Sequence, residues 1–235
     1  MTFALRLLLL AAYLPLAHFA ESRQSDGLAV VALADLAVMV MVDGLCRLRM
    51  GAWLALAVVA GLLALLLRSG HALTPLLLVP PTFTAMVGWF FARSLRAGRV
   101  PVIAKPVAAL YGLTPATLTP AYQRYTRRLT LAWALLLGVL TAINATLALI
   151  AVPNGLLAQC GIRPAVSVTT EQWSFIAHAA NYGLLGVFAA VEFQVRKRVF
   201  PTRPYRNAVD FVRKMAGLGP AFWRDFFRSD PATRD

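Results

Sequence analysis

Residues 127–152 read RRLTLAWALLLGVLTAINATLALIAV, two arginines followed by 24 residues without a charged side chain. A helix rises about 1.5 Å per residue, so such a stretch covers the roughly 30 Å of hydrocarbon in a bilayer. Apolar residues occupy every face of this helix, whereas a helix of a soluble domain needs a polar outer face. The stretch predicts a membrane span over Leu129–Val152 with a cationic end.

The rest of the chain repeats this pattern. Its 235 residues are 59% hydrophobic and 14% charged, whereas about a quarter of the residues in a soluble domain are charged. The other apolar stretches are Phe3–Ala20, Leu28–Cys46, Ala52–Leu67, Ala72–Ala92 and Trp173–Val195. The expected fold class is all-α: a polytopic integral membrane protein with six transmembrane helices in residues 1–195 and a basic amphipathic tail in residues 196–235.

Two of these stretches leave alternatives open. Phe3–Ala20 could be a secretory signal peptide, but it lacks the small-residue cleavage pattern, so a retained span is expected. Ala72–Ala92 contains Pro75, Pro80 and Pro81, and each proline removes a backbone donor. This stretch could be a kinked span or a re-entrant segment whose free carbonyls need cover from protein or water.

The cations predict the topology. With Arg6 inside, 20 of the 23 lysines and arginines fall in cytoplasmic segments, and the three outside are Arg23, Arg68 and Arg163. This bias follows the positive-inside rule and places both termini in the cytoplasm. The same distribution argues against a nucleic-acid partner for the net charge of +13. Cys46 and Cys160 fall on opposite sides of the bilayer, which excludes a disulfide between them within one chain.

Helix-start patterns occur outside the apolar stretches. Thr114-Pro115 and Thr119-Pro120 each resemble an N-cap followed by proline at the first helical position. The second predicts a helix that continues directly into the fifth span. Tyr122, Tyr125 and Trp133 on this helix suit the aromatic belt of a membrane interface.

The tail contains an amphipathic segment, residues 207–229. A break at residues 217–220 divides it, and we expect its apolar faces to be Phe211, Val212 and Met215, then Phe222, Trp223, Phe226 and Phe227. Such a segment could lie in the headgroup region of the inner leaflet. It could equally dock on the protein's own cytoplasmic loops.

Three carboxylates lie within the predicted spans. Asp43 precedes Arg47 by four residues, and Glu192 precedes Arg196 by four, which is the spacing of a helical ion pair. We therefore expect both to be structural. Asp35 has no such neighbour, and a charge in hydrocarbon is costly, so Asp35 is a candidate site for a proton, a substrate or a hydrogen bond between helices.

The sixth span carries a stripe of small and polar residues, which usually packs against another helix. A sharper hypothesis is a polar pocket in which Asp35 and His178 meet. The candidate intramembrane site consists of Asp35, His178, Asn181, Tyr182 and Glu192.

The predicted cytoplasmic loop over residues 93–128 contains seven cations and no acidic residue: Arg93, Arg96, Arg99, Lys105, Arg124, Arg127 and Arg128. Topology alone accounts for only some of them. The surplus predicts a positive surface for anionic headgroups, a phosphorylated small molecule or an acidic protein. A plain solvated or lipid-facing loop is the other interpretation.

No known catalytic pattern occurs. The sequence lacks a nucleophile elbow, a zinc-protease motif, a P-loop and a dinucleotide-binding glycine motif. No cysteine–histidine cluster has metal-ligand spacing, so we expect no metal site and no cofactor. The expectation leans against an enzyme.

The segments Trp89–Lys105, Tyr125–Trp133, Trp173–Tyr182 and Glu192–Pro201 resemble a family of bacterial inner-membrane proteins. Its members are often encoded beside genes for aryl-polyene or xanthomonadin-type pigments. The resemblance covers most of the chain and implies no catalytic role for any residue. It implies a multi-pass protein of the bacterial inner membrane.

The resemblance to this family and the surplus of cations in the loop over residues 93–128 together predict an accessory protein of pigment-lipid biosynthesis. Its basic cytoplasmic face would dock acyl carrier protein, which is acidic, or other pathway enzymes, and such binding weakens as salt screens it. The alternative is a transporter or flippase for a lipid product, for which a homo-oligomer could supply the path.

Overall fold

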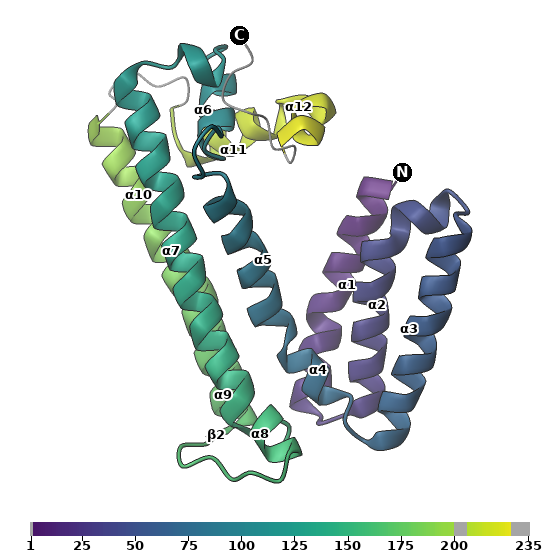
Figure 1. The fold of residues 1–235 in the computed structure, drawn as a ribbon. Helices are drawn as coiled ribbons and strands as arrows, with labels where there is room; N and C mark the ends of the chain where they lie inside the picture. Colours follow the sequence, from purple (N-terminus) through teal and green to yellow (C-terminus); the bar gives the residue numbers. More distant parts are fainter. Residues whose placement is uncertain (1, 200–205, 227–235) are drawn as a thin grey trace. The chain divides into compact units, whose positions relative to one another are not determined.

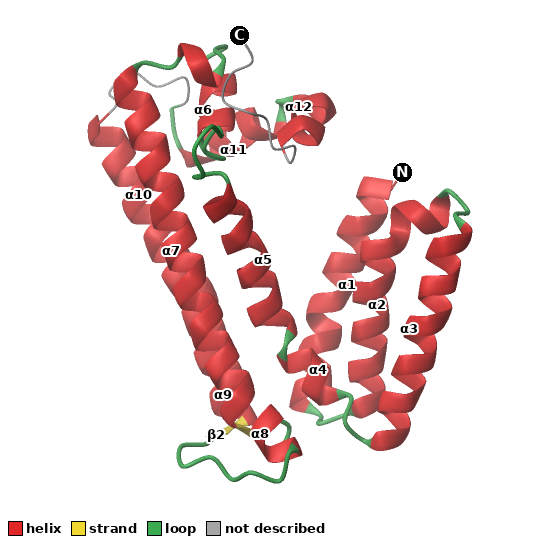
Figure 2. Ribbon diagram, viewed as in Figure 1, coloured by secondary structure: helices red, strands yellow, loops and turns green. Residues whose placement is uncertain are grey.

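The computed structural model describes residues 2–199 and 206–226. Helices dominate these residues, and the two strands, β1 (Ala151–Val152) and β2 (Val168–Thr169), form one short parallel pair (Figure 2). Six helical stretches are long and apolar enough to cross a membrane: Leu5–Ser22, Asp26–Cys46, Met50–Ser69, Leu73–Arg93, Pro120–Ile150 and Phe175–Arg198. The predicted all-α chain with six helices of spanning length is therefore confirmed.

The chain forms two compact units. Unit 1 comprises residues Met1–Pro80 and Asn144–Ala177, and unit 2 comprises Pro81–Ile143 and His178–Asp235. The first division along the chain falls between Pro80 and Pro81, at the double proline of the fourth span.

Unit 1 is built on three antiparallel helices. They are α1 (Thr2–Ser22), α2 (Asp26–Cys46) and α3 (Met50–Ser69), and α2 packs against both of the others (Figure 1). Small side chains allow this close approach, because Ala20, Ala29 and Ala32 are fully buried in the core.

An ion pair joins the first two helices at one end. The Arg6 guanidinium lies 2.7 Å from the Asp43 carboxylate, and both side chains are nearly half exposed. The expected pairing of Asp43 with Arg47 is therefore corrected. Antiparallel packing brings the start of α1 to the end of α2, so Asp43 meets a cation from the neighbouring helix instead of one on its own.

At the opposite end of unit 1, hydrogen bonds from polar side chains connect three segments. The Asp26 carboxylate accepts from the backbone N–H of Ala72 at 2.8 Å, next to the start of α4 (Leu73–Leu77). Asn154 donates to the side chain of Gln24, and its carbonyl accepts from the hydroxyl of Thr74. These bonds tie the α1–α2 turn, α4 and the segment before α8 (Leu156–Gln159) together.

The fourth span is divided into two helices. Helix α4 ends at Leu77, and α5 (Val79–Arg93) begins two residues later. Because Pro80 and Pro81 have no backbone N–H, the α4 hydrogen-bond ladder cannot continue into α5. The two pieces together have spanning length, and the choice between a kinked span and a re-entrant segment stays open.

Unit 2 contains the segment between the fourth and fifth spans. It holds α6 (Ala104–Leu110) and the short 3-10 helix η1 (Pro115–Thr117), which has a capping box at Thr114. Helix α7 (Pro120–Ile150) begins at Pro120 and runs without interruption through the fifth span. Both predicted helix starts are confirmed.

The sixth span changes its helical winding. Helix α9 (Thr170–His178) is followed by a π-helical segment, η2 (Ala179–Leu184), and by α10 (Leu185–Val199). The tail forms α11 (Ala208–Ala216) and α12 (Gly219–Phe226), which confirms an interruption within residues 217–220.

Candidate functional site

Within unit 2, helices α5 and α7 cross closely. A Cβ atom added to Gly88 would lie 3.2 Å from the Cβ of Leu137. One helical turn or so farther along, the hydroxyls of Thr84 and Thr141 are 3.0 Å apart. Glycine and threonine allow the two backbones to approach and supply a hydrogen bond between them, as small residues do between membrane helices.

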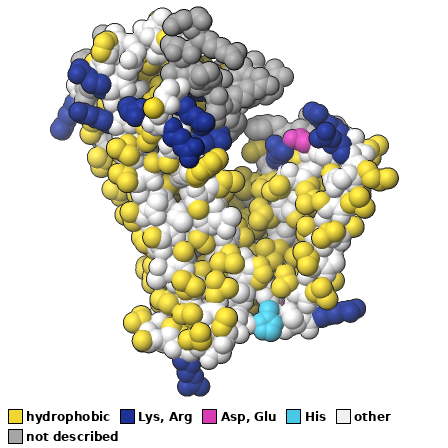
Figure 3. Space-filling view, viewed as in Figure 1, with side chains coloured by type: hydrophobic (Ala, Val, Ile, Leu, Met, Phe, Trp, Pro, Cys, Tyr) yellow, Lys and Arg dark blue, Asp and Glu magenta, His cyan; other side chains and the backbone are white. Residues whose placement is uncertain are grey.

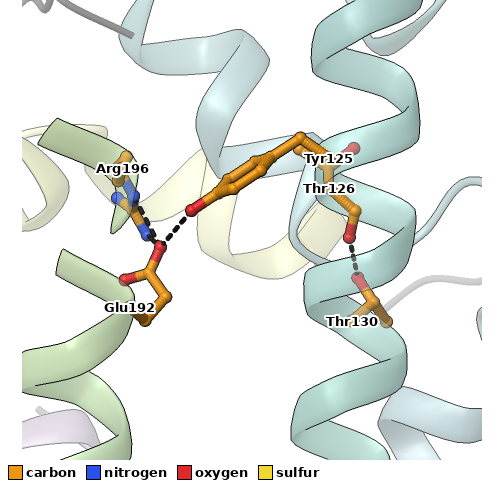
Figure 4. A network of polar contacts seen from close by, with 5 residues as sticks. All are labelled: Tyr125, Thr126, Thr130, Glu192 and Arg196. Atoms are coloured by element: carbon orange, nitrogen blue, oxygen red, sulfur yellow. Dashed lines mark hydrogen bonds and ion pairs between the residues drawn. The ribbon is translucent and has the colours of Figure 1, made fainter. Parts of the chain in front are cut away.

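Helices α7 and α10 are joined by a buried ionic network (Figure 4). One carboxylate oxygen of Glu192 accepts from the Tyr125 hydroxyl at 2.9 Å and from Arg196 Nε at 2.7 Å. The two charged side chains are only 11% and 14% exposed. The expected Glu192–Arg196 pair is confirmed, and the geometry indicates a structural joint in which the charge is neutralised locally.

Tyr125 plays a part that the sequence did not reveal. Its hydroxyl reaches from α7 to Glu192 on α10, and its place in the aromatic belt of the membrane stays a prediction. Its neighbours Thr126 and Thr130 are fully buried, and their hydroxyls bond back to the carbonyls of Gln123 and Thr126. The first turns of α7 therefore lie against protein on the side of Tyr125 and on the side of Thr126 and Thr130.

The other aromatic residues near this end also contact protein. The Tyr111 and Tyr122 hydroxyls are 2.9 Å apart. Trp133 meets Phe91 at 6.3 Å and Phe188 at 4.8 Å between ring centroids. These contacts connect α5, α7 and α10 at the level predicted for the aromatic belt.

Arg127 brings the two basic parts of the loop together. Its guanidinium donates to the carbonyl of Leu95 at 2.9 Å, so the turn after α5 is held beside the first turns of α7. Figure 3 shows Lys and Arg side chains gathered at this end of the unit, with hydrophobic side chains along the helices below. The exposed or half-exposed cations of this basic surface are Arg96, Arg99, Arg124, Arg127 and Arg128.

Acidic side chains of the described residues do not neutralise the basic surface. In the part of the chain that the structure describes, no acidic side chain pairs with any of its five arginines. The other two candidate cations, Arg93 and Lys105, contact other parts of the protein. The Arg93 guanidinium lies over the rings of Trp89 and Phe90 at 4.7 and 5.0 Å, and Lys105 Nζ lies 3.4 Å from the Phe226 carbonyl.

The tail helices dock on unit 2. The Phe226 ring lies 5.9 Å from that of Phe90, and Arg196 lies 5.2 Å from the Phe211 ring. The tail helices therefore contact the ends of α5 and α10, and the position of the tail in the headgroup region, the other alternative, stays a prediction. Val212 is not on the docked face with Phe211, because it is 63% exposed. Phe227 lies outside the described residues.

The residues of the candidate intramembrane site are divided between the two units, so the site as a whole stays a prediction. Asp35 belongs to unit 1, while Asn181, Tyr182 and Glu192 belong to unit 2. The side chain of His178 lies outside the described part, so the Asp35–His178 pocket stays a prediction. Tyr182 is 64% exposed, whereas the Glu192 side chain is only 11% exposed, so these two members of the polar stripe lie in different environments.

Asp35 has an unusual environment within unit 1. Its Oδ2 atom is buried and has no hydrogen-bond partner among the described residues. The other charged groups of α2, Asp26 and Asp43, are eight or nine residues away, or about 12 Å along the helix.

Comparison with known proteins identifies no relative. No family model, no curated protein and no solved structure matches the chain. Among the described residues, no group of three or more histidine, cysteine, aspartate or glutamate side chains could hold a metal ion.

Proposed function

We propose that this multi-pass membrane protein is an accessory docking component that binds an acidic soluble partner through the basic surface of unit 2. The observation that carries the proposal is the set of five arginines without acidic partners, held together by the bond from Arg127 to the Leu95 carbonyl. A fixed cluster of uncompensated cations attracts a protein of opposite charge and speeds its association.

The resemblance to proteins encoded beside pigment genes suggests the partner. Acyl carrier protein, or another enzyme of aryl-polyene or xanthomonadin-type lipid synthesis, would bind at the cytoplasmic face of the bacterial inner membrane. The protein itself would perform no chemistry. It would hold a soluble, acyl-bearing partner next to the bilayer into which the product passes.

The test is binding of purified acyl carrier protein to the full chain in detergent. We expect binding that weakens as salt rises, because exposed charges are screened beyond about 10 Å at 0.1 M salt. The double variant with Arg124→Gln and Arg128→Gln should bind severalfold more weakly. The matched control is Arg23→Gln with Arg68→Gln, which removes the same charge from other segments. Equal binding by both double variants, or binding indifferent to salt, would refute the proposal.

A second candidate function is a transporter or flippase for a lipid product. The observation that favours it is Asp35, whose Oδ2 is buried within a span and lacks a partner among the described residues. Polar groups inside spans often mark transport paths. The test is the distribution of product between leaflets in a strain carrying Asp35→Asn at normal abundance. Accumulation on the inner leaflet supports transport, and a wild-type distribution excludes a role for Asp35 in it.

A further inference from the structure

The two tail helices of unit 2 are fixed at the level where its spans end. Phe226 of α12 packs on Phe90, in the last turn of α5. Phe211 of α11 lies against Arg196, in the last turn of α10. Both contacts are made to residues at the ends of candidate membrane spans. In the predicted topology this is the level at which hydrocarbon gives way to headgroups.

Lys105 adds a polar anchor at the same place. Its ammonium group lies 3.4 Å from the carbonyl of Phe226, the last described residue of α12. The contact holds the end of α12 against the segment before α7.

The outer face of α11 has no cover from the described residues. Val209 is 69% exposed and Val212 is 63% exposed, while Phe211 and Met215 turn inward. The cations of this segment outnumber its acid: Asp210 accepts from the backbone of Arg206 and lies 3.8 Å from Lys214. Arg213 and the Arg206 side chain are exposed beside the valines.

We propose that α11 and α12 form an interfacial platform that binds anionic phospholipid headgroups. Apolar side chains at this depth are covered by acyl chains, and the flanking cations meet the lipid phosphates, as in helices that lie in a membrane interface. The aromatic cluster of Phe222, Trp223 and Phe226 suits the same layer. This inference goes beyond the proposed docking function and uses different residues.

The experiment places an environment-sensitive, reducible fluorophore on a single cysteine of the full chain in nanodiscs. Cys46→Ser and Cys160→Ser remove the native thiols. Val212→Cys carries the test probe, and Ala116→Cys, on an exposed turn of η1, carries the control. Each protein is placed in phosphatidylcholine alone and in phosphatidylcholine mixed with phosphatidylglycerol.

We expect the Val212 probe to emit at shorter wavelength and to be reduced by dithionite severalfold more slowly than the Ala116 probe. The protection should be greater with phosphatidylglycerol and should fall with salt. Arg206→Gln with Arg213→Gln should abolish the difference between the lipids, because these cations recognise the phosphates.

Two results overturn the proposal. One is dithionite reduction at Val212 as fast as at Ala116 in both lipids. The other is protection that persists in detergent and grows with protein concentration, because a second copy of the chain would then cover the face. Val209→Cys repeats the measurement in case labelling at Val212 disturbs α11.

Discussion

Glu192 shows how one ionised residue can be kept in an apolar helix pair. Its carboxylate accepts a hydrogen bond from the Tyr125 hydroxyl on α7 and another from the Arg196 guanidinium on its own helix. Removing a single partner of a buried pair leaves an uncompensated charge, which costs more than the intact pair contributes. The network should therefore matter for stability whatever the protein binds.

We expect Glu192→Ala to lower the free energy of unfolding by about 3 kcal/mol, because Arg196 keeps a buried charge without its partner. Tyr125→Phe should cost less, about 1.5 kcal/mol, since it removes one hydrogen bond to a charged group. Unfolding in mixed detergent micelles measures both. Arg128→Gln, at an exposed residue, is the control, and a Glu192→Ala variant as stable as this control would contradict the structural role.

Residue spacing predicted only the contacts made within one helix. Glu192 and Arg196 are four residues apart and do pair. The same spacing failed for Asp43, which pairs with Arg6 from α1. Tyr125 is 67 residues from Glu192, and nothing local marks the two as neighbours. The sequence offered only one signal for this contact: Glu192 is a carboxylate within a span, and Tyr125 lies at a similar predicted depth on the preceding helix.

At the scale of elements, close helix packing depends on particular glycines. Gly88 faces the Leu137 side chain, whereas a Cβ on Gly138 would meet no atom within 4 Å. Both residues are glycines in the middle of apolar helices, so composition does not distinguish them. They differ because α5 crosses α7 at Gly88, whereas Gly138 faces open space.

We expect Gly88→Leu to destabilise the protein by about 1–3 kcal/mol, because the new side chain must push α5 away from α7. Gly138→Leu, the matched control, should leave stability unchanged or raise it, since leucine favours a helix more than glycine does. Thermal unfolding of the two purified variants measures the difference. Equal stability of the two would show that α5 and α7 do not pack closely at Gly88.

At the scale of the whole molecule, the predicted topology places the two thiols on opposite faces of the membrane. Cys46 is the last residue of the second span and Cys160 follows the fifth span, and both side chains are exposed. Charge bias puts the segment after an even-numbered span inside the cell and the segment after an odd-numbered span outside.

We expect a membrane-impermeant maleimide added to intact spheroplasts to label Cys160 and to spare Cys46. After permeabilisation both should react. Cys46→Ser and Cys160→Ser variants assign the labelled thiol, and mass spectrometry quantifies it. Labelling of Cys46 in intact spheroplasts would reverse the orientation and move the basic surface out of reach of any cytoplasmic partner.

The six helices of spanning length, the helix start at Pro120 and the interruption within the tail followed from the sequence alone. In hydrocarbon a backbone must satisfy its hydrogen bonds within its own helix, so an apolar run of sufficient length becomes a span wherever its neighbours lie. Helix-start signals are local for the same reason.

The tertiary structure alone decided which side chains meet between elements. The bond from Arg127 to Leu95, the pair of Arg6 with Asp43 and the docking of Phe226 on Phe90 depend on how each helix is rotated and offset against its neighbour. Rotation and offset arise from the shapes of all the packed side chains together, and no single stretch of sequence encodes them.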